Sequence, residues 1–244
     1  MCEGGVQMKI GIMQPYFFPY IGYFQLIHYV DKWIVFDDVQ YIQQGWINRN
    51  RILHPTRGWQ YITVPVVKHS YKDLIKDIHI SNTKDWKMKI LNQIYHYKKK
   101  APFYNQSMSL IEKMLNIHTE SITELNVHIL EGVCDYLEIP FSYQISSQNN
   151  YNHNHVKNAE ERVIAISNQL QANEYVNSIG GKGLYDKRRF QQEGIKLSFL
   201  KSNINQLVYE QGSQPFEPAL SIIDILMFCS KDEIRAMLDK YEVL

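Results

Sequence analysis

The chain has 244 residues, 45% of them hydrophobic, which is enough to bury a sizeable core in one large domain or two small ones. Its 26 Lys and Arg residues nearly cancel its 25 Asp and Glu residues, so the net charge of +1 argues against nucleic acid and against an acidic membrane as partners. No apolar run reaches the roughly 20 residues that span a bilayer, no secretion signal is recognisable, and three widely spaced cysteines match no zinc site, so we expect a cytoplasmic protein with reduced thiols.

The first elements predict an α/β fold. Residues 1–7 have no periodicity and are expected to form a disordered extension. Met8 to Gln14 has the pattern of a buried strand, Ile21 to Tyr29 that of a helix, and Trp33 to Phe36 that of a second strand. A strand, a loop, a helix and a strand within about 30 residues indicate a βαβ unit with parallel strands.

The remaining elements continue this alternation around a helical segment. Residues 59–65 and 78–80 have strand character, 84–137 contain three helical stripes, and 138–143 resemble a return to the sheet. A second βαβ unit follows, with a helix at 159–170, a strand at 174–178, a glycine-rich turn at 180–183, a helix at 184–192 and a strand at 195–199. After an irregular passage at 202–218, two helices close the chain, and the second begins at the capping box of Ser230 and Glu233. The expected organisation is an extension at 1–7, a first α/β half at 8–83, a helical segment at 84–140, a second α/β half at 141–204, and C-terminal helices at 205–244 packed on the same domain.

The turn after the first strand is crowded with prolines and tyrosines that follow neither helical nor strand periodicity. Beyond Gln14, the hydroxyls of Tyr16, Tyr20 and Tyr23 and the amides of a helix N-terminus could surround a phosphate or carboxylate, which Gly22 would allow to approach closely. The alternative is that the rings pack against the sheet and use their hydroxyls locally. The missing periodicity favours a binding site.

Polar and aromatic residues also follow the second strand. Asp37 and Asp38 occupy the position where a carboxylate can bind a ribose, a hydrated metal or an amine, although the pair could simply open a turn. On an extended segment Arg49 and Arg51 would point the same way and could grip a diphosphate, with surface salt bridges as the alternative. Trp46 could stack on a base or a sugar. Further candidates in this segment are Gln40, Tyr41 and Asn48.

The glycine-rich turn at 180–183 lies between a strand and a helix, as a phosphate cradle requires, but it lacks the full P-loop spacing, and a tight turn is equally consistent with it. A second wall of the site would consist of Ser178, Gly180, Gly181, Lys182 and Tyr185. No metal site is predicted, because His153 and His155 have no evident third ligand. The run 98–100 of three lysines is expected to complement a helix dipole rather than bind phosphate.

Four blocks carry a family resemblance: Met13–Gln25, Phe36–Tyr41, Gly45–Arg51 and Phe216–Asp224. Together they resemble the WbqC-like family of bacterial proteins, over Met8 to the C-terminus. Members are typically found with surface-polysaccharide biosynthesis, especially that of the O-antigen of lipopolysaccharide. The Pro-Tyr-Ile-Gly-Tyr sequence at 19–23 is also similar in placement to the His-x-Gly-His signature of adenylyl-transferring enzymes, but a neutral phenol cannot replace a cationic imidazole.

The resemblance implies an α/β fold with a parallel, Rossmann-like sheet of the nucleotidyltransferase or HUP type, an inserted helical segment and C-terminal helices. The preferred hypothesis is a transferase or ligase of surface-glycan biosynthesis that acts on a nucleotide-linked amino sugar by acyl or aminoacyl transfer. In this hypothesis Asp38 positions or deprotonates the amine, with Tyr20 and Tyr23 completing the catalytic set. Phosphates would contact Tyr20, Gly22, Tyr23, Lys182, Arg49 and Arg51.

Two alternatives stay open at this stage. The protein could be a non-catalytic subunit that binds a sugar nucleotide, or a nucleotidyltransferase with a degenerate His-x-Gly-His motif. The expected partner is a nucleotide sugar or another small molecule. The sequence assigns no cofactor with certainty, and ATP with Mg²⁺ is the candidate. It makes no prediction of oligomeric state.

Overall fold

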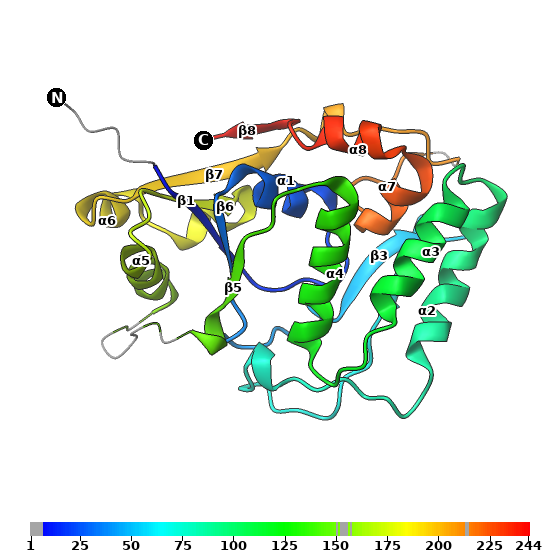
Figure 1. Ribbon diagram of the computed structural model, residues 1–244, viewed down its shortest axis with the longest axis horizontal. Helices are drawn as coiled ribbons and strands as arrows, with labels where there is room; N and C mark the ends of the chain where they lie inside the picture. Colours follow the sequence, from blue (N-terminus) through cyan, green and yellow to red (C-terminus); the bar gives the residue numbers. More distant parts are fainter. Residues whose placement is uncertain (1–6, 150, 152–155, 157, 213–214) are drawn as a thin grey trace.

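The computed structural model describes residues 7–149, 151, 156, 158–212 and 215–244 (Figure 1). Its centre is a six-stranded sheet in the order β5-β2-β1-β6-β7-β8. The strands are β1 (Lys9–Met13), β2 (Lys32–Val35), β5 (Tyr143–Ile145), β6 (Glu174–Ser178), β7 (Lys196–Ser202) and β8 (Tyr241–Val243). All neighbours pair in parallel except β8, which is antiparallel to β7. The predicted α/β fold with a mostly parallel sheet is confirmed, whereas residues 1–6 of the expected extension and His153 and His155 lie outside the described residues.

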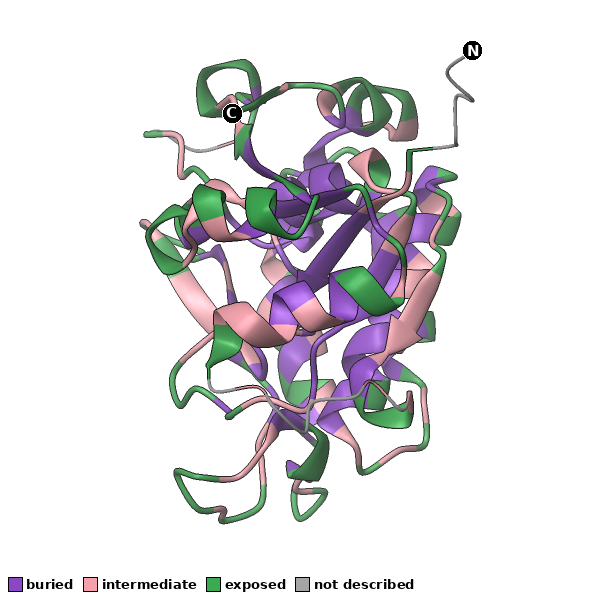
Figure 2. Ribbon diagram, turned by 90° about the vertical axis from the view of Figure 1, so that its left-hand side faces the viewer, coloured by how far each residue is buried: buried purple, intermediate pink, exposed green. Residues whose placement is uncertain are grey.

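Both faces of the sheet are covered, and this explains why the first two strands, β1 and β2, are mostly apolar. Ile10 and Ile12 of β1 pack with α5 (Ala159–Gln169) and α6 (Lys187–Gln192). Trp33 and Val35 of β2 pack on the opposite face with α1 (Ile21–Tyr29), α4 (Ile122–Leu137) and α7 (Ile222–Phe228). Figure 2 shows the central strands buried and the outer helical surfaces exposed.

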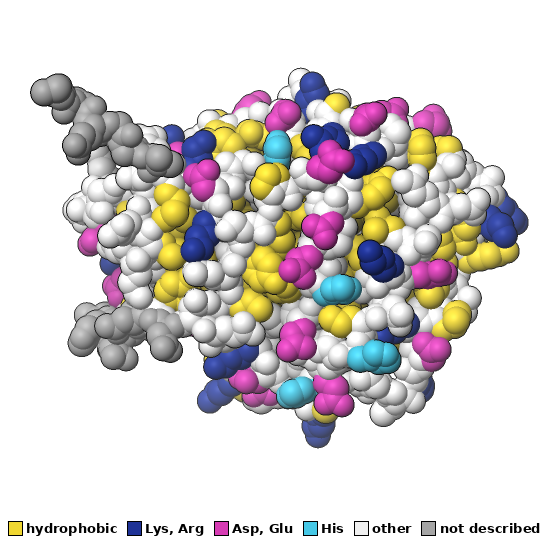
Figure 3. All heavy atoms as spheres, in the orientation of Figure 1, with side chains coloured by type: hydrophobic (Ala, Val, Ile, Leu, Met, Phe, Trp, Pro, Cys, Tyr) yellow, Lys and Arg dark blue, Asp and Glu magenta, His cyan; other side chains and the backbone are white. Residues whose placement is uncertain are grey.

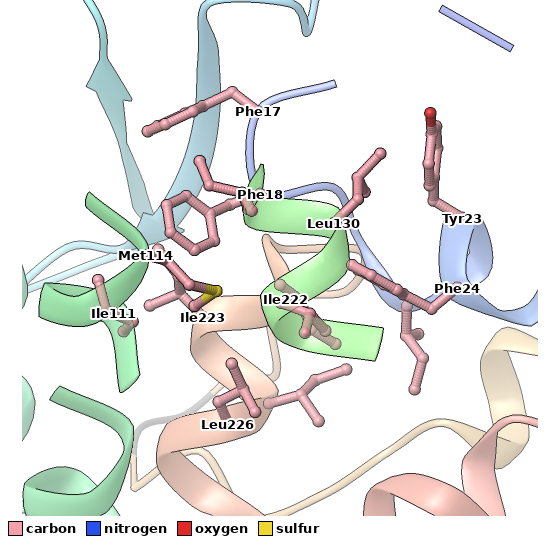
Figure 4. Close-up of a cluster of buried hydrophobic side chains, with 14 of the residues drawn as sticks. Phe17, Phe18, Tyr23, Phe24, Ile111, Met114, Leu130, Ile222, Ile223 and Leu226 are labelled. Atoms are coloured by element: carbon pink, nitrogen blue, oxygen red, sulfur yellow. The ribbon is translucent and has the colours of Figure 1, made fainter. Parts of the chain in front are cut away.

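The helical segment follows the predicted stripes. It contains α2 (Trp86–Ile94), α3 (Tyr104–Leu115) and α4, and α4 begins after Ser121, whose hydroxyl accepts a hydrogen bond from the amide of Glu124. The last helix, α8 (Lys231–Met237), begins with the complete capping box predicted at Ser230. Side chains of α3 and α7 meet Phe18 of the first loop in one buried cluster (Figure 4). The short 3₁₀ helices are η1 (Ile75–Asp77), η2 (Tyr95–Lys99), η3 (Ser146–Gln148), η4 (Ile179–Leu184) and η5 (Ile204–Gln206).

A separate antiparallel hairpin consists of β3 (Arg49–Leu53) and β4 (Trp59–Thr63). The pattern at 59–65 predicts β4, whereas no strand is predicted at β3, because the buried residues of β3 include the polar Asn50 beside Ile52 and Leu53. The three-residue β8 is too short to show a period. Residues 78–80, predicted as a strand, form only isolated bridges. None of the helices in the described part of the chain is long and apolar enough to cross a membrane.

Candidate ligand-binding site

A cavity of about 280 Å³ opens at the carboxyl ends of β1 and β6. It is lined by Met13, the last residue of β1, and by Ser178, the last residue of β6. The chain passes from β1 to β2 on one side and from β6 to β7 on the other, so the strand order reverses between β1 and β6. Ligands of open parallel sheets bind outside the carboxyl ends of the strands at such a reversal. We call this cavity the switch-point cavity.

The loop at 14–20, which forms one wall, is held from three directions. Asn50 Nδ2 donates a hydrogen bond to the carbonyl of Phe18 (2.9 Å), and Ser221 Oγ donates to the same carbonyl (2.8 Å). Asn126 Nδ2 of α4 donates to the carbonyl of Pro15 (3.0 Å). Phe18 has a φ of 40°, in the left-handed region that L-residues avoid, so these bonds hold a strained loop in one shape.

Asn50 and Ser221 lie in segments that the sequence associates with the site, whereas nothing in the sequence analysis singles out Asn126. Asn126 is 0% exposed within an otherwise apolar helical stripe, and a buried amide requires hydrogen-bond partners. A polar residue in that stripe is therefore the feature of the sequence that indicates a hydrogen-bonded support for the loop at 14–20.

Tyr16 and Tyr20 line the switch-point cavity, and the Tyr20 hydroxyl also has a hydrogen bond with the side chain of Ser202. Burial raises the pKa of both phenols, so both are neutral donors near pH 7. Gly22, at the start of α1, leaves room for the ring of Tyr20, because a Cβ at this position would lie 2.4 Å from that ring. The glycine therefore serves the packing of a tyrosine as well as the shape of the cavity.

Tyr23 also lines the cavity, but its hydroxyl is already engaged. It donates a hydrogen bond to the carbonyl of Gln14 (2.8 Å), and the ring packs 5.0 Å from that of Trp33. Burial raises the pKa of this phenol well above its ordinary value. Tyr23 therefore acts as a support for the loop, and Gln14 contributes its backbone to the same contact.

Arg51 supplies positive charge to the cavity. Its guanidinium lies between the rings of Trp46 and Trp59, 5.5 Å and 5.2 Å from their centroids, and donates from Nη2 to the carbonyl of Ala219 (3.3 Å). Among the described residues its buried Nε has no hydrogen-bond partner, and no ion pair includes it. This arginine can therefore still bind an anionic group with most of its donors.

Arg49 shares a face of β3 with Arg51, as the sequence predicts for an extended segment. Its guanidinium lies 4.1 Å from the centroid of the Tyr61 ring and donates to the carbonyls of Gln44 and Gly45. It does not line the cavity. Arg49 thus shapes the loop before β3, and the expected pair of phosphate-gripping arginines is not assembled.

The lining of the switch-point cavity has no carboxylate, imidazole or thiol among the residues that the structure describes. Nor do the described His, Cys, Asp and Glu side chains form any group suited to a metal ion. The lining therefore offers hydrogen-bond donors, one cation and aromatic surface, which suit an anionic or sugar-bearing ligand. It does not offer a general base.

The two aspartates after β2 lie outside this cavity. Asp38 forms an ion pair with Arg162 of α5, which also donates from Nη1 to the carbonyl of Asp38 (2.8 Å). Asp37 is 1% exposed and accepts hydrogen bonds from the amide (2.9 Å) and hydroxyl (2.6 Å) of Ser147. Burial raises the pKa of the Asp37 carboxyl, against the effect of those bonds. Both residues fasten the end of β2 to neighbouring elements.

Of the other candidates from the segment after β2, some line the switch-point cavity and others do not. Trp46 lies at the cavity, whereas Gln40, Tyr41 and Asn48 do not line it. Gln40 Nε2 donates to the carbonyl of Tyr71 (2.5 Å), Tyr41 is 4% exposed, and Asn48 Nδ2 donates to a backbone carbonyl of residue 64 (2.9 Å). These contacts tie loops together.

The glycine-rich turn forms the 3₁₀ helix η4, and no residue of η4 lines the cavity. Ser178, the residue before η4, does line it. Gly181 packs against Asn177, whose side chain would lie 2.8 Å from a Cβ at 181. Tyr185 packs on Tyr175, with ring centroids 5.6 Å apart, on the α5 and α6 face of the sheet. The members of the predicted second wall that do not line the cavity are Gly180, Gly181, Lys182 and Tyr185.

Comparisons with known proteins place these features in a family. The sequence profile of the WbqC-like protein family matches residues 14–236, which include the first loop, the hairpin and Ser178. The uncharacterized protein Rv1507c of Mycobacterium tuberculosis (strain ATCC 25618 / H37Rv) is 32% identical over 220 residues, covering 89% of this chain and 92% of that protein. No solved structure matches the chain.

Proposed function

The chain belongs to the WbqC-like protein family, and from this premise we propose that its switch-point cavity binds a nucleotide-linked amino sugar during synthesis of a bacterial surface glycan. The observation that supports this proposal is Arg51, a cation without an ion-pair partner among the described residues, at the reversal point of a parallel sheet. The association with surface glycans comes from the family resemblance, and the anionic part of the ligand follows from the charge.

In this proposal Arg51 binds a phosphate or carboxylate through charge-assisted hydrogen bonds, and the neutral hydroxyls of Tyr16 and Tyr20 donate to the same group. The cavity of about 280 Å³ is at the lower limit of ligand pockets, which hold roughly 300–1,000 Å³. A nucleotide sugar would therefore extend beyond it. Trp46 and Trp59, which are 38% and 40% exposed, provide aromatic surface on which a base or sugar can stack.

The reaction that we propose is amide formation. The amine of the sugar attacks the carbonyl carbon of an acyl or aminoacyl donor, the donor's leaving group departs with the bonding electrons, and the proton that the amine loses passes to that leaving group. Because Asp38 is paired with Arg162 outside the cavity, it is not used as the base. ATP with Mg²⁺ is the cofactor that would activate an unactivated acyl group.

The test is binding of nucleotides and nucleotide sugars, measured by thermal shift and calorimetry. Arg51→Gln should weaken the ligand that is found by about 10- to 100-fold, the effect of losing a charge-assisted contact. Lys182→Gln is the matched control, since Lys182 is exposed and outside the cavity. Equal affinities of wild type and Arg51→Gln would contradict the proposal.

A non-catalytic, sugar-nucleotide-binding subunit is the second candidate. It is favoured by the absence of a carboxylate or imidazole from the described lining of the cavity. Incubation of the identified ligand with activated acyl donors, followed by mass spectrometry, separates the two candidates. A product whose mass has increased by the acyl group supports transfer, whereas binding without turnover supports the subunit. Release of pyrophosphate from ATP or CTP would instead indicate nucleotidyl transfer.

A further inference from the structure

A second cavity, of about 390 Å³, lies between the turn that joins β3 to β4 and the 3₁₀ helix η2. The turn contributes His54 and Arg57 to its lining. From η2 and the residue that follows it come His96, Lys99 and Lys100. We call it the basic cavity. Nothing in the proposed function assigns it a role.

The positive charge around the basic cavity is only partly compensated. Glu217 is the one carboxylate in its described lining, and none of the ion pairs between described residues includes Arg57, Lys99 or Lys100. The chain as a whole carries a net charge of only +1, and acidic and basic side chains are interspersed on the face shown in Figure 3. Like charges held together repel, so an anion in this cavity would lower the energy of the folded state.

His96 adds an unsatisfied polar atom to this lining. Its Nδ1 lies 2.7 Å from the carbonyl of Gln93, which can only accept, so Nδ1 carries the hydrogen. Its Nε2 is buried and has no hydrogen-bond partner in the described structure. Burial lowers the pKa of this imidazole, and the nearby charges of His54 and Lys100 lower it further. In the neutral ring Nε2 can only accept a hydrogen bond, so it can bind a hydroxyl group of a ligand, and it would donate to an anionic oxygen only after the imidazole is protonated.

We propose that the basic cavity is a second anion-binding site, which holds the phosphate groups of a small organic molecule against Arg57, Lys99 and Lys100. The volume has room for on the order of ten water molecules, more than an inorganic phosphate needs. Tyr95 and Phe228 add aromatic surface for an organic part. A cavity of this size in a chain of balanced charge fits a small molecule better than a nucleic acid strand, which requires an extended basic groove.

The geometry also divides the lysine run at 98–100. Lys98 lies over the ring of Tyr95, 5.2 Å from its centroid, and does not line the cavity, whereas Lys99 and Lys100 do. A helix-dipole role alone, the expectation from the sequence, does not distinguish these positions. Lys98 therefore provides a control of equal charge on the same element.

The test is calorimetric titration of the full chain with inorganic pyrophosphate at low salt. The Arg51→Gln variant is the parent, so that the switch-point cavity does not contribute. In that background, Lys98→Gln should leave the affinity unchanged, and Arg57→Gln with Lys100→Gln should weaken it at least tenfold. Affinity that is the same with and without the Arg57 and Lys100 changes, or no binding to the parent, would overturn the proposal.

Two further measurements use only the Arg51→Gln parent, so they do not depend on the folding of the Arg57 and Lys100 variants. Chemical-shift changes on adding pyrophosphate to the Arg51→Gln parent should be centred on residues 54–58 and 95–100, and changes centred elsewhere would overturn the assignment. Adenosine diphosphate should bind the same parent more tightly than pyrophosphate, because its organic part contacts the aromatic lining. If it binds no more tightly, the organic part of the proposal is wrong.

Discussion

The buried carboxylate of Asp224 should make the stability of this protein depend on pH. The residue lies in α7, is 0% exposed, and accepts hydrogen bonds from the hydroxyls of Tyr97 (2.6 Å) and Tyr209 (2.5 Å) and from Gln211 Nε2 (2.9 Å). Burial raises its pKa from the ordinary value of 3.8 to about 6, although the three hydrogen bonds oppose that rise. The same network holds the hairpin, because the Tyr97 hydroxyl also accepts from the amide of Leu53 (2.9 Å).

The sign follows from proton binding. Between 3.8, the value in the unfolded chain, and about 6, the value in the fold, the folded state keeps a proton on Asp224 that the unfolded state has released. The free energy of unfolding therefore falls as pH rises through this window, and the contribution is lost above it. A pKa of about 6 against 3.8 corresponds to about 3 kcal/mol.

The perturbation is Asp224→Asn, which has no proton to bind at this position. Urea denaturation of both proteins from pH 4 to pH 8 gives the free energy of unfolding at each pH. Between pH 4 and pH 8 the wild type should lose about 2.5 kcal/mol relative to the variant, beside a constant offset for the altered hydrogen bonds. The comparison removes the contributions of Asp37 and His96, whose pKa values are also shifted and are common to both proteins. A difference that stays constant with pH would refute the reasoning.

Further substitutions test the packing of the site and one strained position outside it. Gly22→Ala places a Cβ 2.4 Å from the Tyr20 ring and should cost about 1–3 kcal/mol and weaken ligand binding, so an unchanged melting temperature would argue against this contact. Asn50→Ala removes the donor to the Phe18 carbonyl and should cost about 1–3 kcal/mol in urea denaturation, and Asn50→Asp should not restore it because a carboxylate cannot donate. Gln171→Gly, at an exposed residue with a φ of 55°, should stabilise the fold by up to about 1 kcal/mol, and a loss of stability in the same assay would contradict the strain argument.

Much of the architecture follows from local pattern. The continuous apolar residues of β1, predicted at Met8 to Gln14 and found at Lys9–Met13, require burial on both faces whatever their neighbours. The capping residues at Ser121 and Ser230 begin their helices through hydrogen bonds to amides three residues away. These interactions span a turn or a strand, so the amino-acid sequence alone determined them, and the mostly parallel sheet followed from their alternation.

The membership of the cavity was decided by tertiary structure. Arg49 and Arg51 are equivalent in sequence, yet one lies on Tyr61 and only the other reaches the cavity. Asp38 looks like a free base until the fold brings Arg162, which is 124 residues away, to its carboxylate. A polar side chain binds whichever partner lies nearest in space, and that distance depends on how whole elements pack. Periodicity shows which faces are buried, but it carries no information about the partners that they meet.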